Sequence, residues 1–124
     1  MFKEMKIAAG LQKTEHFDPT VLDAQTVLKM ATLEGAKLLG IDKEVGTLEP
    51  GKKADIILIN MNQPHLVPHH HIPSLLAYSA NGSDVDTTIV NGKILMKNRK
   101  LLTIDEREVI REAHKRVARI VEGV

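Results

Sequence analysis

The segment from Gly46 to Asp55, which leads directly into four aliphatic residues, constrains the fold of this chain more than any other. Its Pro50-Gly51 pair predicts a type II turn, because proline presets φ at the first central position and glycine accepts the positive φ of the second. Residues 56–59 read Ile-Ile-Leu-Ile, which predicts a strand covered on both faces. The sequence thus places a turn that starts a buried strand near the centre of the chain.

The composition is that of one small globular domain. The 124 residues are 43% hydrophobic and carry 17 basic and 16 acidic side chains, with a formal charge of +1. The charges are interspersed and aromatic residues are few, so we expect no binding to nucleic acid or to an anionic membrane. The absence of cysteine excludes disulfides and thiolate sites. No signal peptide and no run of roughly 18 apolar residues is present, so we expect a cytoplasmic protein.

Apolar periodicity predicts three helices. The first covers residues 1–13, where Met1, Phe2, Met5, Ala8 and Ala9 recur at helical spacing. Its uncapped start looks like the continuation of an upstream element. The second begins at an N-cap, Asp23, and ends before Gly40. The third begins at a capping box that spans residues 103–106. The last two have the same apolar spacing, with predicted buried faces made of Val27, Leu28, Ala31, Gly35, Leu38 and Leu39, and of Val109, Ile110, Ala113, Val117, Ile120 and Val121.

The later strands are predicted by turn chemistry. Residues 85–90 and 93–96 are β-favouring runs on either side of an Asn-Gly pair, which is typical of a hairpin with a type I′ turn. Residues 98–100 predict a second turn. Before these strands, prolines at 64, 68 and 73 exclude a regular helix or a central strand from that part of the chain. Directly after Pro73, Ser74 is expected to cap a short helical turn.

One string imitates a metal site. Residues 69–71 are three histidines, and in an extended segment His69 and His71 point to the same side, close enough to share a metal ion. Their position between prolines favours a surface or interdomain loop, so we assign them no metal. Adventitious binding of nickel or zinc is the better expectation, and a small metal carrier is the weakest of the functional alternatives.

The remaining polar residues offer no catalytic constellation. His16, His65 and His114 lack a carboxylate at triad spacing, so we expect them to be exposed or structural. The serines have no Gly-x-Ser-x-Gly context, and Asp84 with Asp86 is interpreted as the start of a strand. We assign no catalytic residue.

Several local strings, taken in order, resemble one enzyme family across nearly the whole chain. They resemble the C-terminal portion of the 5′-methylthioadenosine/S-adenosylhomocysteine deaminases, members of the amidohydrolase superfamily once loosely called chlorohydrolases. The strings are Met30-Ala31-Thr32, Gly35-Ala36, Leu39-Gly40, the segment 46–55, Leu76, Tyr78-Ser79-Ala80, Gly82-Ser83-Asp84-Val85 and Ile89-Val90-Asn91-Gly92-Lys93.

The resemblance implies an α+β fold in three parts. Residues 1–43 would be helices from the end of an amidohydrolase barrel. Residues 44–103 would form a small antiparallel sheet, half of a composite β-sandwich, with a Pro/His-rich loop at 61–74, and residues 104–124 a C-terminal helix. The implied partner is the upstream barrel segment of the same protein, and we also expect a homo-oligomer.

The resemblance also implies a chemistry that lies outside this chain. The related enzymes use a divalent metal, usually zinc, to generate the hydroxide that displaces ammonia from the purine. Their metal ligands and acid/base residue would all map upstream of Met1. His70 falls on a histidine often seen in the family, but His71 and Ile72 replace an acid and a proline there. We therefore assign this chain no catalytic, cofactor-binding or metal residue and expect it to be inactive alone. The alternative is a free-standing oligomerisation or partner-binding module.

Overall fold

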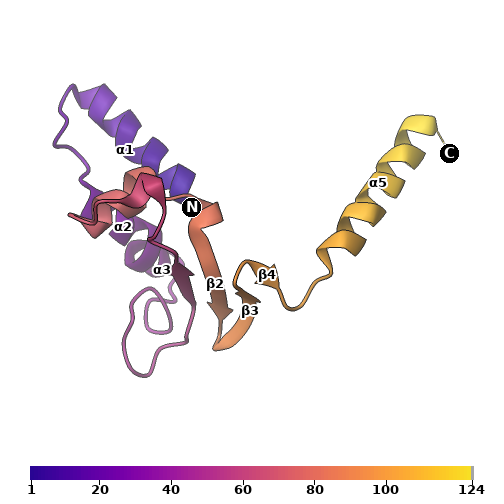
Figure 1. Ribbon diagram of the computed structural model, residues 1–124. Helices are drawn as coiled ribbons and strands as arrows, with labels where there is room; N and C mark the ends of the chain where they lie inside the picture. Colours follow the sequence, from indigo (N-terminus) through magenta and orange to yellow (C-terminus); the bar gives the residue numbers. More distant parts are fainter. Residues whose placement is uncertain (124) are drawn as a thin grey trace.

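The computed structural model describes residues 1–123 and places helices beside a small antiparallel sheet (Figure 1). In chain order the elements are α1 (Phe2–His16), α2 (Ala24–Lys29), the π-helical turn η1 (Met30–Glu34), α3 (Gly35–Leu38), β1 (Ile56–Ile59), the 3₁₀ turn η2 (Pro64–Leu66), α4 (Ile72–Ser74), the π-helical turn η3 (Leu75–Ser79), the 3₁₀ turn η4 (Gly82–Asp84), β2 (Val85–Val90), β3 (Lys93–Lys97), β4 (Lys100–Leu101) and α5 (Glu106–Glu122). Within residues 1–123, no helix has the length and apolar character needed to cross a membrane.

The first helix agrees with its prediction and runs three residues further. Met5 and Ala9 are buried, and no side chain caps the helix at Met1. The helix ends because Phe17 adopts a left-handed conformation with φ of 50°. The polar residues before Phe17 gave no apolar signal, which is why periodicity alone stopped the predicted helix too early.

The second helix starts as predicted, but the end of its predicted apolar face is not buried. The Asp23 carboxylate accepts a hydrogen bond from the Thr26 N–H at 2.9 Å. Further on, the helix continues through the wider turn η1 into α3. Ala36 is buried, whereas the predicted Leu38 and Leu39 are 88% and 72% exposed. The predicted burial is therefore wrong for Leu38 and Leu39.

The core is small and aliphatic, and it lies where α1, α2 and η3 meet. Its buried members are Met5, Ala9, Ala24, Val27 and Ala77, and the half-buried side chains around it include Phe2, Leu22, Leu28, Ala31 and Tyr78. Small alanines at the contact points let the helix backbones approach closely. The helical layer is thus held by packing within residues 1–80.

The sheet has the strand order β1-β2-β3-β4, with every neighbouring pair antiparallel. Ile89 of β2 lies opposite both Ile56 of β1 and Ile94 of β3. The predicted hairpin is confirmed, since Asn91 and Gly92 have φ of 48° and 76°, as a type I′ turn requires. The second turn is confirmed as well, with positive φ at two consecutive residues, Asn98 and Arg99.

The strand β1 forms where expected, but the expected cover on both faces is absent from the described chain. β1 is an edge strand, and Ile57 and Leu58 are 47% and 52% exposed. The unbroken aliphatic run predicts burial, whereas the nearest described elements leave part of both faces open. The mixed helix and strand composition with a small antiparallel sheet agrees with the predicted α+β class.

The proline-rich stretch contains only short helical turns, as predicted. The helical turn at 72–79 is capped by His71, whose Nδ1 accepts a hydrogen bond from the Ser74 N–H at 3.3 Å. The predicted capping role of Ser74 is therefore wrong. Ser74 lies inside the first turn, three positions after the N-cap residue His71.

The last helix forms, but its predicted burial does not. Asp105 is the N-cap in place of Thr103, since its carboxylate accepts hydrogen bonds from the N–H groups of Arg107 and Glu108 at 3.0 and 3.2 Å. All six residues of the predicted apolar face are exposed, because α5 extends away from the sheet and the other helices (Figure 1). The predicted division at residues 43 and 103 stays a prediction, and Val124 lies outside the described residues.

Candidate functional site

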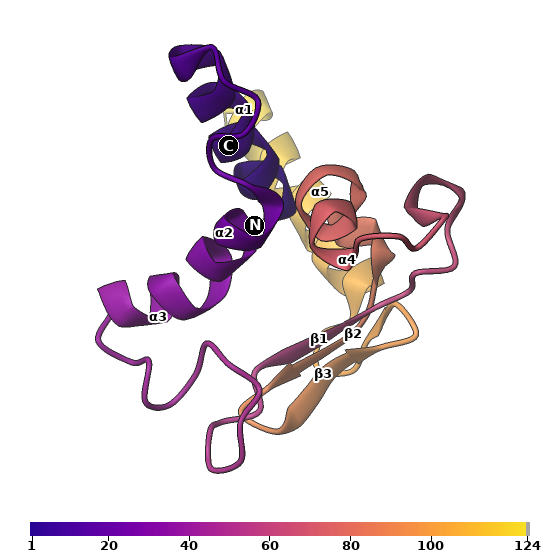
Figure 2. The ribbon, with the colours of Figure 1, turned by 90° about the vertical axis from the view of Figure 1, so that its left-hand side faces the viewer.

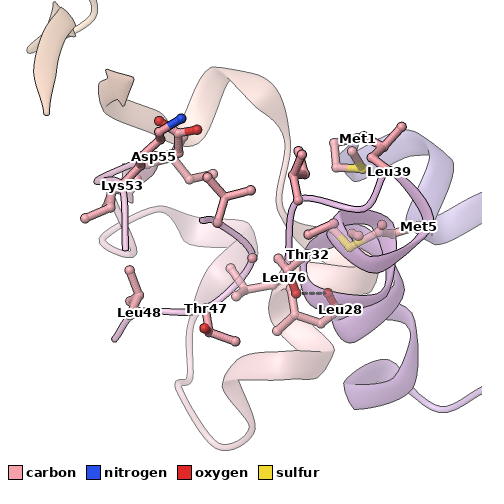
Figure 3. Close-up of a pocket in the computed structure, with 18 of the residues that line it drawn as sticks. Met1, Met5, Leu28, Thr32, Leu39, Thr47, Leu48, Lys53, Asp55 and Leu76 are labelled. Carbon is pink, nitrogen blue, oxygen red and sulfur yellow. Dashed lines mark hydrogen bonds between the residues drawn. The ribbon is translucent and has the colours of Figure 1, made fainter. Parts of the chain in front are cut away.

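An apolar trough of about 660 Å³ lies between the helical layer and β1. In the close-up of Figure 3, Met5, Leu28 and Leu76 lie on one wall, and Leu48, Lys53 and Asp55 lie across the space from them. Exposed side chains of Leu39 and Ile57 extend the apolar lining. We call this hollow the trough.

The polar groups on the trough wall already have partners. The Thr32 hydroxyl donates to the Leu28 carbonyl at 2.8 Å, which is the dashed line in Figure 3. Lys53 pairs with Glu44, and this pair raises the pKa of the Lys53 ammonium. The Asp55 carboxylate accepts the Asn91 N–H at 2.6 Å. A wall of this kind suits apolar side chains better than a small polar ligand, because it presents few polar groups that lack a protein partner.

The segment 46–55 forms one end of the trough, and both of its glycines have a positive φ. The Lys52 N–H donates to the Glu49 carbonyl at 3.2 Å and Gly51 has φ of 91°, which confirms the predicted type II turn. Gly46 has φ of 98°, and a Cβ on it would lie 2.9 Å from the Cβ of Ala36. Only glycine at position 46 therefore lets the chain pass this close to Ala36 of α3. Figure 2 shows the loop that follows α3 and leads into β1.

A second cluster surrounds Asp84, whose residue is only 4% exposed. Its Oδ2 lies 2.9 Å from His65 Nε2 and accepts the Asn81 N–H at 2.8 Å. The Arg99 guanidinium donates to the carbonyls of Gly82 and Val85, at 2.9 and 3.0 Å. The cluster joins the loop that contains η2, the turn η4 and the end of the β3-β4 hairpin.

The electrostatics of the cluster favour an ionised Asp84. Burial acts to raise the pKa of its carboxyl, but hydrogen bonds from His65 and Asn81, together with the nearby charges of His65 and Arg99, outweigh burial. The pKa of Asp84 is thus held below its usual range. A buried carboxylate with this many donors is a structural anchor.

The cluster does not form a catalytic unit within residues 1–123. A carboxylate beside a half-exposed histidine has the arrangement of a base and its orienting group, but no hydroxyl is hydrogen-bonded to His65. Sequence reasoning missed the contact because 19 residues separate its partners. One local signal was present: Asn81 and Asp84 have capping-box spacing and form that box.

The three histidines at 69–71 are divided between different partners. His69 Nε2 lies 2.9 Å from the Met61 carbonyl, and His71 Nδ1 lies 2.7 Å from the Ser74 hydroxyl. No group of three or more His, Cys, Asp or Glu side chains within residues 1–123 is arranged to hold a metal ion. The zinc that the resemblance implies is therefore not matched by the ligands present in this part of the chain. His16 and His114 are exposed, as expected.

Residues 1–95 match the amidohydrolase family. The chain belongs to the amidohydrolase family. It is 50% identical over 124 residues to a 5-methylthioadenosine/S-adenosylhomocysteine deaminase of Desulforudis audaxviator, and 51% identical over 124 residues to a 5′-deoxyadenosine deaminase of Methanosarcina mazei. The matches cover 100% of this chain but only 29% and 28% of those proteins. The resemblance stated from the sequence is thus confirmed.

A solved structure shows the same arrangement of elements. The crystal structure of an adenosine deaminase from Xanthomonas campestris with bound zinc is 35% identical to this chain and superposes with a TM-score of 0.93. The match covers 98% of this chain and 28% of that one. The chain therefore spans less than a third of the length of the relatives it matches.

Proposed function

We propose that this chain serves as the C-terminal region of a metal-dependent amidohydrolase that hydrolytically deaminates an adenosine derivative. The observation that carries the proposal is identity of about one residue in two, across the full chain, to proteins named as deaminases of adenosine derivatives. The reaction would cleave a C–N bond and release ammonia. The chain would supply structural support and no reacting group.

The trough is the surface through which this support would act. Its apolar lining and the half-exposed residues of β1 need cover that the described residues do not provide. The edge of β1 that faces away from β2 has no strand partner among residues 1–123, and an open edge is a template for strand addition. We assign this surface to the region that the relatives contain and that has no counterpart in this chain.

The proposal accounts for the lack of a metal-ligand cluster among the described residues. The deaminase relative of known structure contains zinc, and the part of this chain described by the structure forms no ligand cluster for it. The metal ligands and the acid/base residue would belong to the region with no counterpart here. The isolated chain is accordingly expected to be inactive, and no step of the reaction is assigned to its residues.

A chimera tests the proposal. Residues 1–124 would replace the matching C-terminal region of the Desulforudis audaxviator relative. Ammonia release would then be measured from 5′-methylthioadenosine, S-adenosylhomocysteine and 5′-deoxyadenosine, with zinc supplied. We expect activity from the chimera and none from either part alone. Activity of the isolated chain, or a folded chimera without activity, would contradict the proposal.

Two adjacent leucines provide matched variants for the role of the trough. Leu39 lines the trough, whereas its neighbour Leu38, which is 88% exposed, does not. In the chimera, Leu39→Glu should lower the yield of assembled enzyme and its activity at least tenfold, because a charge would be buried against an apolar surface. Leu38→Glu should leave both nearly unchanged. Equal effects of the two variants would show that the trough is not the docking surface.

The alternative proposal is a free-standing module that binds a partner or oligomerises without catalysis. It is favoured by the open edge of β1 and by the exposed apolar face of α5. The chimera separates the two proposals, because a binding module would not restore deamination to a truncated enzyme.

A further inference from the structure

The helical turn at residues 72–79 is capped by a side chain that can titrate. His71 has an extended backbone, with φ of −144° and ψ of 95°, and its carbonyl accepts the Leu75 N–H at 3.2 Å. Its ring Nδ1 accepts the Ser74 N–H at 3.3 Å, as the side chain of an N-cap residue does. The side chains usually found at this position accept through an oxygen. An imidazole accepts only through a ring nitrogen that carries no proton.

The hydrogen bonds of His71 determine which ring nitrogen carries its proton. A backbone N–H can only donate, so the Nδ1 that it contacts must present a lone pair. The Ser74 hydroxyl lies 2.7 Å from the same nitrogen and donates to it as well. The proton of the neutral ring is therefore on Nε2. The opposite tautomer would direct an N–H group at the Ser74 N–H and remove its acceptor.

A second proton on the ring would abolish the cap. Both nitrogens of an imidazolium are donors, so Nδ1 could no longer accept from Ser74. The positive charge would also lie beside the first turn of a helical segment, where the backbone dipole favours negative charge. Histidine is the side chain whose charge ordinarily changes between about pH 5 and pH 8. The cap thus depends on a proton that is gained under weakly acidic conditions.

The titratable groups near His71 come from α1, α2 and η3. Lys13 of α1, the α2 cap Asp23 and Tyr78 of η3 line the same hollow of about 480 Å³ as His71, and His70 precedes it in the chain. The Lys13 ammonium donates to two backbone carbonyls of the loop before α2. The Asp23 carboxylate is engaged as the cap of α2. The charges of Lys13 and Asp23 offset each other, so this lining does not favour an imidazolium.

The capped turn contributes to both the core and the trough. Ala77 is 1% exposed and belongs to the core cluster with residues of α1 and α2. Leu76 lies on the trough wall (Figure 3). A change in the first turn of this segment would therefore reach the packing of the helical layer and one wall of the trough.

We propose that His71 is a pH-sensitive cap of the helical turn at residues 72–79. The neutral ring holds the first turn through the Ser74 N–H, and a proton taken up at Nδ1 releases it. The contribution of the cap is present where the ring is neutral and is lost as the pH falls through the range in which the ring gains its proton. The inference goes beyond the proposed deaminase function and does not depend on it.

A non-titrating cap tests the proposal in the complete chain. His71→Asn keeps a side-chain acceptor at the N-cap but has no proton to gain. Urea unfolding would be measured at about pH 7.5 and about pH 5.5, on either side of the ordinary range of histidine. Acidification should raise the unfolding equilibrium constant of the natural chain roughly fivefold relative to that of His71→Asn, the usual effect of losing one cap. His70→Asn is the matched control and should behave like the natural chain. An equal response of the natural chain and His71→Asn would overturn the proposal.

Nuclear magnetic resonance of the natural chain provides a measurement that needs no variant for its result. Correlations between the ring nitrogens and ring protons distinguish the two tautomers, and we expect the Nε2–H form of His71 near neutral pH. The Ser74 amide signal should shift, and its exchange with solvent should accelerate, over the same pH range in which the His71 ring titrates. His71→Asn would identify the ring signals. An Nδ1–H tautomer, or a Ser74 amide that does not respond as the ring titrates, would overturn the proposal. Neither measurement involves deaminase activity.

Discussion

The second and the last predicted helices carry identical spacings of apolar residues, yet the described chain covers only the first part of the second helix and no part of the last. Val27 of α2 is 1% exposed because α1 and η3 pack on it, whereas Val117 of α5 is 58% exposed. The difference lies in the neighbours, since α2 follows α1 through a short loop and α5 leaves the sheet from its last strand. An apolar stripe therefore shows that a helix needs cover, but not which part of the protein provides it.

The largest expected effect comes from comparing the same charged substitution in the apolar stripe of α2 and in that of α5. Val27→Asp should lower the free energy of unfolding of the chain by at least about 3 kcal/mol, because an unpaired carboxylate would be buried in the core. Val117→Asp should change it by less than about 0.5 kcal/mol when measured below the concentration at which copies associate. Urea titration followed by circular dichroism measures both. Similar losses from the two variants would show that α5 packs within its own chain.

The packing of the segment 46–55 against α3 can be tested at Gly46. Gly46→Ala should cost about 2–4 kcal/mol, since alanine would adopt an unfavourable positive φ and its Cβ would clash with Ala36. Gly10→Ala is the control. Its Cβ would have no neighbour within 4 Å, so it should stabilise α1 by about 0.5–1 kcal/mol. A neutral Gly46→Ala would show that the segment 46–55 does not lie closely against α3.

Asp84 links the loop that contains η2 to the turn η4, and its contribution to stability should depend on pH. Asp84→Asn should cost about 1–3 kcal/mol at pH 7, because the buried donors would lose their charged acceptor. The folded-state pKa of Asp84 is lowered, so its contribution is fully present above the unfolded pKa of about 3.9 and is lost as the pH falls through the lower folded value.

The measurement for Asp84 is the difference in unfolding free energy between the natural chain and the variant at several pH values. It should be present at pH 5 and should shrink as the pH falls below about pH 4. A difference that does not change between pH 5 and pH 3 would contradict an ionised, hydrogen-bonded Asp84. The double variant with His65→Ala should show non-additive losses, because the two side chains share one contact.

The smallest effect is expected on the polar face of α5. The Lys115 Nζ lies 3.8 Å from a Glu112 carboxylate oxygen and the two side chains are 57% and 39% exposed, so Lys115→Ala should change stability by less than about 0.5 kcal/mol. Thermal unfolding of the two proteins at equal concentration measures it. A larger loss would mean that this face of α5 has a contact beyond the helix.

Local chemistry was predictable where one short stretch contained the whole cause. The turn at Pro50-Gly51, the hairpin at Asn91-Gly92 and the cap at Asp23 each depend on a few adjacent residues with restricted conformations or a side-chain acceptor. The elements that these signals delimit were correspondingly well placed. The family was also recognisable, because its strings are spread along the chain in their usual order.

The errors came from positions where distant residues decide. The burial predicted for Leu38 and Leu39 is absent from the described chain, whereas Ala36 is buried where Gly46 approaches it from a distant segment. The contact between His65 and Asp84 joins two loops that approach only after the sheet and η3 are in place. The trough is likewise a product of tertiary structure, since its walls come from segments as distant in sequence as α1 and Leu76.

The sequence by itself determined which residues of this protein turn, cap, extend or coil, because steric limits on the backbone and short-range hydrogen bonds act within a few residues. It also determined the family. Only the tertiary structure decided which apolar faces are covered and which remain open, because burial depends on how elements far apart along the chain meet. The open trough, the free edge of β1 and the bare stripe of α5 follow from that arrangement.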